Sequence, residues 1–312
     1  MYDNLDFSLS RDKVNNIDFL REVPKRLERT SEHYFNDNQD VCVTGYLGTL
    51  KVSVSNRAVK VKDSSFCKWL LGDNLQGLYR GDVERGFDKL SDLLSLPMQD
   101  ANVTRIDLAQ NIIVKHDMGV YLNHLGNLQY YNRLTQNNGL YYQNGNGLLL
   151  FYGKVHESKI KGVPVPEIYK GRNVLRYERR FKKDLCKQFN MPELTVKSLY
   201  LEDFYVGIID RWYNDYVKIQ KLTDIHFDYT MVTGKRQVQQ QAILYYVQQR
   251  GGLINVLNEI IEAQKKKELT PWQANDLREV YKDACNSELM TSKSELIREL
   301  DAKMKESLRF YR

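Results

Sequence analysis

The hydrophobic pattern of this chain changes its period once, and that change limits the folds available to it. Before about residue 225, many apolar residues alternate with polar ones or form short runs bounded by turns, as strands do. From residue 234 onward, apolar residues recur at helical spacing and little strand character remains. We therefore expect an α+β fold, with an antiparallel-sheet body over residues 1–225 and a helical C-terminal region over residues 226–312. Two related sheet halves with helices packed on them are one way to build such a body.

The segments that carry the two periods can be placed along the chain. The alternating or short apolar pattern predicts strands at 41–62, 103–114, 139–152 and 173–181. The helical pattern predicts helices at 82–95, 117–128, 201–222, 235–250, 253–267, 271–285 and 289–309. Because Asn144-Gly145-Asn146-Gly147 has the composition of a tight turn, the segment 139–152 is expected to form a hairpin.

The composition is that of a globular protein in a reducing compartment. Hydrophobic residues make up 42% of the chain and charged residues 28%, which excludes a disordered chain. No apolar run approaches the roughly 18 residues of a membrane span, and the polar, acidic N-terminus is unlike a secretory signal. The four cysteines are scattered without a Cys-x-x-Cys spacing, which favours free thiols. We expect a cytoplasmic protein with no membrane partner.

Basic residues are concentrated in one segment of the chain. Residues 154–187 hold eleven Lys and Arg and four Asp and Glu, a net charge of +7, whereas the whole chain carries +6. A solvated surface is the simplest interpretation, but a concentrated basic stripe interleaved with tyrosines is more typical of a surface that contacts phosphate. We therefore expect nucleic acid as the partner. The residues expected to contact DNA are Arg105, Lys170, Arg172, Arg179, Arg180, Lys182 and Lys183.

A charged pair interrupts the apolar strand predicted at 103–114. In a strand, Arg105, Asp107 and Asn111 project to the same face. Charges are costly to bury unless they are paired or bind a metal ion. The simplest interpretation is an ion pair between Arg105 and Asp107, and the alternative is that Asp107 is a metal ligand.

A tyrosine and a lysine follow one another closely at the end of the predicted hairpin. Tyr152 and Lys154 are expected to share a strand face, where the ammonium group would favour the phenolate and neutralise a phosphate. Such a tyrosine is a usable nucleophile. Because the chain has 21 tyrosines, packing is the more common role for any one of them.

The strand predicted at 173–181 carries one acid among arginines. Arg176, Glu178 and Arg180 alternate on one face, so Glu178 is either a salt-bridge partner or an oxygen ligand for a divalent ion. On neighbouring strands, Asp107 and Glu178 would suit Mg²⁺ or Mn²⁺. His116 and His156 follow the first two segments, which makes them possible third ligands.

Several motifs of other enzyme classes are absent from the sequence. No two histidines stand at positions i and i+2, so the histidine-hydrophobe-histidine metal motif of many nicking enzymes is missing. Neither a Walker A loop nor a Gly-x-Gly-x-x-Gly motif occurs, which argues against an ATPase or a nucleotide-cofactor enzyme. The His-x-x-Arg signature of tyrosine recombinases does not occur either.

Taken together, three motifs resemble those of the rolling-circle replication initiators. They are the Arg-x-Asp-Leu-Ala strand of 105–109, the aromatic-Tyr-x-Lys motif of 151–154 and the Arg-x-Glu strand of 176–178. The family includes the plasmid replication initiation factors and the gene II/X-like initiators of filamentous phages. The chain is most similar to the versions of Bacteroides-type bacteria, in which stretches like 89–92, 103–107, 121–126 and 171–178 recur.

The resemblance implies a role for each motif. It places the nucleophile at Tyr152 and a divalent metal ion, Mg²⁺ or Mn²⁺, on Asp107 and Glu178. The plasmid pattern often has a second acid where this chain has Asn111, a weaker Mg²⁺ partner than a carboxylate. The resemblance and the positive charges of Lys154 and Arg176 together predict that these two residues offset the charge that develops on the phosphate.

The expected activity is site-specific nicking and rejoining of one DNA strand at a replication origin. Cleavage would leave a 5′-phosphotyrosine and a free 3′-OH that primes a host polymerase. The expected partners are an origin hairpin or duplex, the single-stranded product, a host helicase and polymerase in a bacterial cell, and a second copy of the chain. The alternative is an initiator that binds the origin and recruits the replisome without cutting, for which Tyr152, Asp107 and Glu178 would be dispensable.

Overall fold

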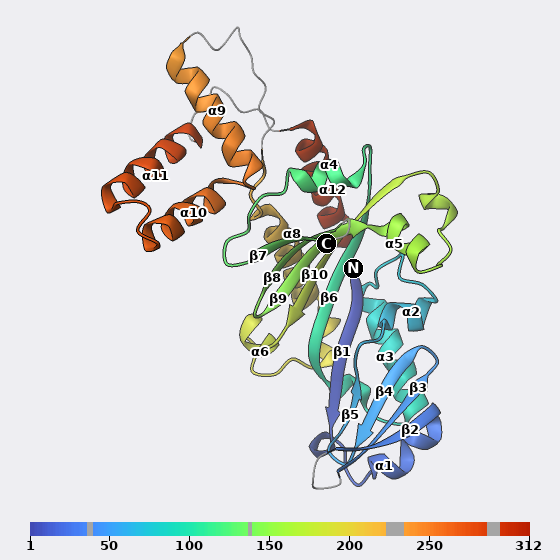
Figure 1. The fold of residues 1–312 in the computed structure, drawn as a ribbon. Coiled ribbons are helices and arrows are strands. Elements are labelled where there is room, and N and C mark those ends of the chain that lie inside the picture. Colours follow the sequence, from blue (N-terminus) through green and yellow to red (C-terminus); the bar gives the residue numbers. More distant parts are fainter. Residues whose placement is uncertain (36–39, 137–138, 223–233, 286–293) are drawn as a thin grey trace.

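The computed structural model describes residues 1–35, 40–136, 139–222, 234–285 and 294–312. Its centre is a ten-stranded sheet in which all the neighbouring strands pair antiparallel, in the order β2-β3-β4-β5-β1-β6-β10-β9-β8-β7 (Figure 1). The strands are β1 (Tyr2–Ser10), β2 (Glu28–Phe35), β3 (Asp40–Leu47), β4 (Leu50–Ser55), β5 (Ala58–Val61), β6 (Asn102–Val114), β7 (Asn132–Gln136), β8 (Gly139–Asn144), β9 (Gly147–Gly153) and β10 (Asn173–Lys182).

The sheet consists of two halves with the same connection order. Read from its outer edge inward, the first half places its strands as β2-β3-β4-β5-β1, and the second half as β7-β8-β9-β10-β6. The first strand of each half therefore lies at the centre, where β1 pairs with β6. The expectation of an α+β fold with two related sheet halves is confirmed.

The helices lie between and after the strands. They are α1 (Phe19–Glu22), α2 (Phe66–Leu71), α3 (Arg80–Leu94), α4 (Met118–Asn123), α5 (Lys154–Ile160), α6 (Leu185–Gln188), α7 (Val196–Leu199), α8 (Glu202–Val217), α9 (Lys235–Gln249), α10 (Leu253–Lys265), α11 (Pro271–Cys285) and α12 (Glu295–Tyr311). Short 3₁₀ turns cover Arg11–Lys13, Pro24–Arg26, Met98–Asp100 and Glu167–Tyr169. In the described part of the chain, no helix is both long and apolar enough to cross a membrane.

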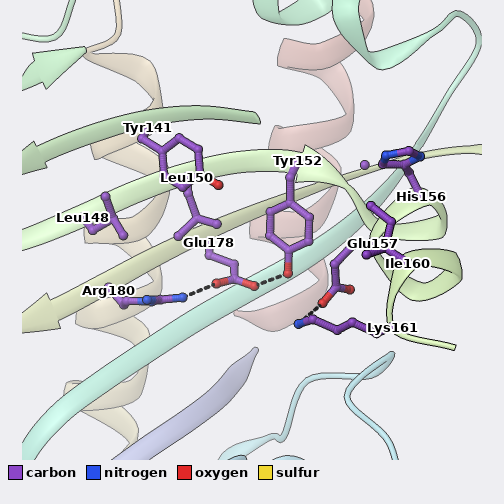
Figure 2. A pocket seen from close by; sticks show the side chains of 11 residues that line it. Tyr141, Leu148, Leu150, Tyr152, His156, Glu157, Ile160, Lys161, Glu178 and Arg180 are labelled. Carbon is purple, nitrogen blue, oxygen red and sulfur yellow. Dashed lines mark hydrogen bonds and ion pairs between the residues drawn. The ribbon is translucent and has the colours of Figure 1, made fainter. Parts of the chain in front are cut away.

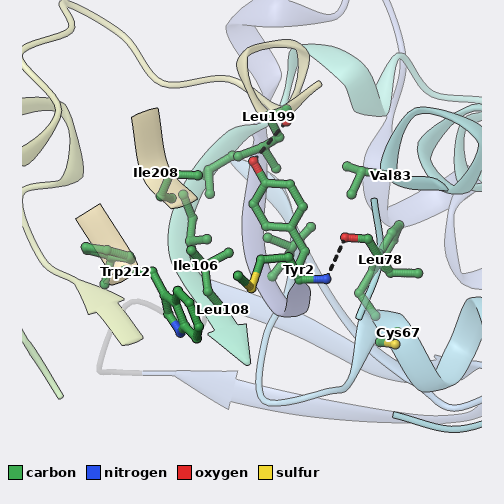
Figure 3. Close-up of a cluster of buried hydrophobic side chains, with 14 of the residues drawn as sticks. Tyr2, Cys67, Leu78, Val83, Ile106, Leu108, Leu199, Ile208 and Trp212 are labelled. Carbon is green, nitrogen blue, oxygen red and sulfur yellow. Dashed lines mark hydrogen bonds between the residues drawn. The ribbon is translucent and has the colours of Figure 1, made fainter. Parts of the chain in front are cut away.

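One face of the central strands is covered by helices. Ile106 and Leu108 of β6 pack in a buried cluster with Ile208 and Trp212 of α8, and the hydroxyl of Tyr2 donates to the carbonyl of Leu199 at 2.9 Å (Figure 3). This burial explains the alternation of β6, because its odd-numbered residues from Arg105 to Asn111 then face the other side of the sheet.

The strand β1 is not among the predicted strands. Its register against β6 shifts between Tyr2 and Asn4, which disturbs the acidic start of the strand. From Leu5 onward the apolar residues Leu5, Phe7 and Leu9 alternate with polar ones, so this part follows the ordinary strand pattern and could have been recognised.

The helical end divides between two apolar clusters. Helices α9, α10 and α11 share a small core of Val247, Val256, Ile260 and Ala274. They lie away from the sheet in Figure 1. In contrast, α12 returns to the body, where the hydroxyl of Tyr311 donates to Gln110 Oε1 of β6 at 2.9 Å. The predicted boundary at residue 225 and the start of the helix predicted at 289–309 lie outside the described residues.

Candidate active site

The face of the sheet opposite α8 gathers the polar residues of three neighbouring strands. In the register of the sheet, Arg180 of β10 lies opposite Asp107 of β6, and Arg176 of β10 lies opposite Tyr152 of β9. Glu178 lies between the two arginines on the same face. The structure thus brings the residues of all three sequence motifs together.

The hydroxyl of Tyr152 donates a hydrogen bond to Glu178 Oε1 at 2.6 Å (Figure 2). The same carboxylate accepts from Arg176 Nε at 2.7 Å and from Arg180 Nη2 at 3.3 Å. Burial acts to raise the pKa of Glu178, but the charge of Arg176, the bond from Tyr152 and the charge of Arg180 outweigh it, and the pKa falls to about 2. Burial raises the pKa of Tyr152, despite the opposing charge of Arg176. The pair is therefore a neutral phenol bonded to a carboxylate.

Arg176 is buried and holds the pair in place. Besides Glu178, its guanidinium group forms an ion pair with Asp3 Oδ2 at 2.8 Å and donates to Asn111 Oδ1 at 3.0 Å. Asn111 therefore supports the site through an arginine. Sequence reasoning missed Asp3 for two reasons. The register shift at the start of β1 hides the direction of its side chain, and its partner, Arg176, is far away in the sequence.

Asp107 is completely buried and paired with two arginines. It accepts from Arg105 Nε at 2.8 Å, and its Oδ2 lies 3.1 Å from Arg180 Nε. Burial raises the pKa of Asp107 to about 6, although the bonds and charges of Arg105 and Arg180 act in the opposite direction. The ion pair between Arg105 and Asp107 exists, and Arg180 connects Asp107 with Glu178.

An open pocket of about 310 Å³ gives access to these residues. Tyr152, Glu178 and Arg180 line it, together with Glu157 of α5 and Lys161 directly after this helix (Figure 2). Asp107 is not among the lining residues. A ligand that enters the pocket therefore reaches the hydroxyl of Tyr152 next to Glu178, which is the hydrogen-bond acceptor of that hydroxyl.

Lys154 does not share a strand face with Tyr152, so that expectation is wrong. The strand β9 ends at Gly153, and Lys154 is the first residue of α5. Its ammonium group is buried, 2.9 Å from Glu157 Oε2 and 3.3 Å from Asn74 Oδ1. Burial also lowers the pKa of Lys154.

Apart from Arg179, which is described below, the residues expected to contact DNA form two groups in the structure. Arg105 and Lys182 lie opposite each other in the register of β6 and β10, beside Arg180 on the open face. Lys170, Arg172 and Lys183 are exposed outside that row. A contact with DNA stays a prediction for both groups.

Arg179 must be corrected, because its side chain points to the helix-covered face. It is 2% exposed, and its Nε lies 2.7 Å from Asp215 Oδ2 of α8. The guanidinium group also lies over the ring of Phe181. In this position it stabilises the packing of α8 on the sheet and has no access to DNA.

We expect Arg179→Ala to lower the free energy of unfolding by about 3 kcal/mol, because Asp215 would keep a nearly buried charge with only the more distant Lys218 as a partner. Urea denaturation measures this loss. Lys183→Ala, at an exposed position nearby, is the control and should leave stability unchanged. Unchanged stability together with weaker DNA binding in Arg179→Ala would contradict the structural role.

The described residues contain no group of three or more His, Cys, Asp or Glu side chains arranged to hold a metal ion. Of the two histidines considered as third ligands, His156 lines the pocket of Tyr152. The ring of His116 lies instead near the ring of Tyr121, at 6.5 Å between centroids.

Comparison with known protein families gives a match over most of the chain. The family described as the N-terminal part of the phage replication-associated protein, the gene II protein, matches residues 1–204. This range covers the whole sheet and every residue of the pocket, and it ends at the start of α8. No curated protein matches the chain.

Proposed function

We propose that this chain, which belongs to the phage replication-associated protein family of rolling-circle replication initiators, nicks one DNA strand through Tyr152. The observation that carries the proposal is the hydrogen bond of 2.6 Å from the hydroxyl of Tyr152 to Glu178 inside an open pocket. A positioned hydroxyl with an acceptor in reach is the arrangement that nucleophilic catalysis requires.

A divalent metal ion is part of the proposal, and Asp107 and Glu178 are the carboxylates that would hold it. Both contact the guanidinium group of Arg180, so an ion would replace Arg180 as their shared counter-charge, and carboxylates are the oxygen ligands that Mg²⁺ and Mn²⁺ prefer. Water and phosphate oxygens would complete the ligand set, as is common for Mg²⁺. When bound there, the ion would polarise the scissile phosphate.

Attack by Tyr152 on phosphorus forms a tyrosyl–phosphate bond and breaks the bond from phosphorus to the 3′ oxygen. Glu178 receives the phenolic proton, the 3′ oxygen leaves, and the proton passes on to it through solvent, so that the strand ends in a 3′-hydroxyl and Glu178 is again a carboxylate. Because the pKa of Glu178 is about 2 and that of Tyr152 is raised, the proton stays on the tyrosine until the new bond begins to form. The reverse reaction rejoins the strand without ATP, since the covalent bond retains the energy of the phosphodiester.

The arginines have different roles in this proposal. Arg180 lines the pocket and is partly exposed, so it can offset charge on the phosphate. Arg176 is buried behind Glu178, which makes it a positioning residue. Lys154 is similarly buried in its ion pair with Glu157, and its effect on the phosphate would act at longer range.

Supercoiled DNA that carries the gene of this chain and its flanks is the substrate for a direct test. With Mg²⁺ or Mn²⁺, we expect the protein to convert it to the nicked circle, and EDTA to abolish this conversion, because the two carboxylates would lose their ion. Gel electrophoresis resolves the two forms. Binding to the same DNA without nicking under either metal would contradict the proposal and favour an initiator that recruits the replisome without cutting.

A further inference from the structure

The open face of the sheet has a charged half and an apolar half that meet at β9. Leu134 of β7 lies opposite Tyr141 of β8, which lies opposite Leu150 of β9, and Leu150 in turn lies opposite Glu178. The row of three apolar side chains thus leads directly to the carboxylate that binds Tyr152. Leu134 is 43% exposed, so the outer part of this row is open to solvent.

The ring of Tyr141 lies close to the proposed nucleophile. Gly139 is the direct partner of Tyr152 across β8 and β9. A Cβ atom on Gly139 would come 3.1 Å from Cε2 of Tyr141, so the tyrosine ring occupies the space above this glycine. Figure 2 shows Tyr141 and Leu150 on the side of the pocket away from the residues of α5, and both line it.

This division matches the two chemical parts of a nucleotide. The charged half offers Arg180, which lines the same pocket as Tyr152 and contacts Glu178 on the side away from the tyrosine, and this suits an anionic phosphate (Figure 2). The apolar half offers the ring of Tyr141 and the exposed side chain of Leu134, with the nearly buried Leu150 beside them, and an aromatic ring suits the face of a base. A base inside a continuous duplex has both faces covered by its neighbours, so a base that stacks here must lie outside the duplex stack, as the bases of a single strand do.

We propose that Tyr141, supported by Leu134 and Leu150, holds one unpaired base next to the scissile phosphate. The proposal rests on the nicking function above and adds to it the direction in which the strand crosses the site. The base lies over β8 and β7, and the phosphate lies over β9 and β10. Tyr141 is then a specificity-determining residue that contacts substrate without taking part in the bond changes.

The test compares two single-stranded probes of equal charge. One is a fluorescein-labelled oligonucleotide of twelve thymidines, and the other has the same backbone with an abasic site at each position. We expect wild-type protein to bind the thymidine probe more tightly, and Tyr141→Ala to lose roughly tenfold on that probe and little on the abasic one. Tyr141→Phe should keep the wild-type preference, because the ring remains.

Tyr34→Ala is the matched control, since Tyr34 is an exposed tyrosine on β2 in the other half of the sheet. An equal loss on both probes in Tyr141→Ala, or no loss on either, would overturn the base-binding role. Because these probes measure binding alone, that result leaves the nicking proposal intact. Conversely, a wild-type protein that does not nick supercoiled DNA but prefers the thymidine probe, with this preference lost in Tyr141→Ala, would contradict the nicking proposal and retain the base-binding role.

Discussion

Replacing Tyr152 with phenylalanine is expected to abolish nicking while DNA binding remains. The variant lacks the only atom proposed to form the covalent bond, so the cleavage rate should fall by at least about 10³-fold. The ring stays in its place on β9, and Glu178 keeps both arginine partners, so the fold should be retained. Phosphate contacts dominate the affinity for DNA, and one hydroxyl contributes little to it. Strand cleavage and gel-shift binding on the same DNA measure the two effects.

Tyr142→Phe is a suitable control for this experiment. Tyr142 is adjacent to the pocket residue Tyr141 in sequence, but its side chain is buried and its hydroxyl donates to the carbonyl of Gly126 at 2.6 Å. Normal cleavage by Tyr152→Phe would show that Tyr152 is not the nucleophile. Tyr177 is also buried, with its hydroxyl bonded to the carbonyl of Trp212, so Tyr141 would then be the next candidate to examine.

The second large effect is expected for Glu178→Gln. The amide retains the shape of the side chain but removes the negative charge that accepts from Tyr152 and Arg176 and that would bind the metal ion. We expect the cleavage rate to fall by at least about 10²-fold, as is typical when a positioned acid–base group is lost. Raising the Mn²⁺ concentration should not restore it.

Glu157→Gln is the matched control for the charge of the pocket. Glu157 lines the same pocket and forms ion pairs with Lys154 and Lys161, but it is not the acceptor of Tyr152. We expect it to cleave far faster than Glu178→Gln, because the acceptor of Tyr152 is unchanged, and urea denaturation measures separately the stability lost at the buried Lys154. Full activity of Glu178→Gln across a Mn²⁺ titration would show that Glu178 has no part in the chemistry.

The sequence predicts those parts of the fold that depend on local patterns. The alternation along β6, β9 and β10 is regular because one face of each strand is buried, so the shared face of Asp107 and Glu178 follows from residue order. The structure pairs β10 with both β6 and β9, so the three strands that carry the three motifs are neighbours, as the resemblance implies for a single site. The charged site could therefore be anticipated before the structure.

The errors have a common physical cause in tertiary contacts. Asp3 was missed because the register of β1 shifts at this residue and because its partner, Arg176, is far away in sequence. The direction of Arg179 followed from alternation, but its charge suggested a surface, and only the position of Asp215 on α8 explains its burial. Lys154 is an exception, because its error is local: the strand was extended through Gly153, which instead ends β9 and is the N-cap of α5.

The most direct test of the central claim is to trap and map a covalent adduct. The protein is incubated with Mn²⁺ and supercoiled DNA carrying its gene and flanks, denatured with SDS, and digested for mass spectrometry. The proposed mechanism predicts a nucleotide attached to the hydroxyl oxygen of Tyr152 and absent from the Tyr152→Phe variant. An adduct on another tyrosine, or nicked DNA without any adduct, would contradict it.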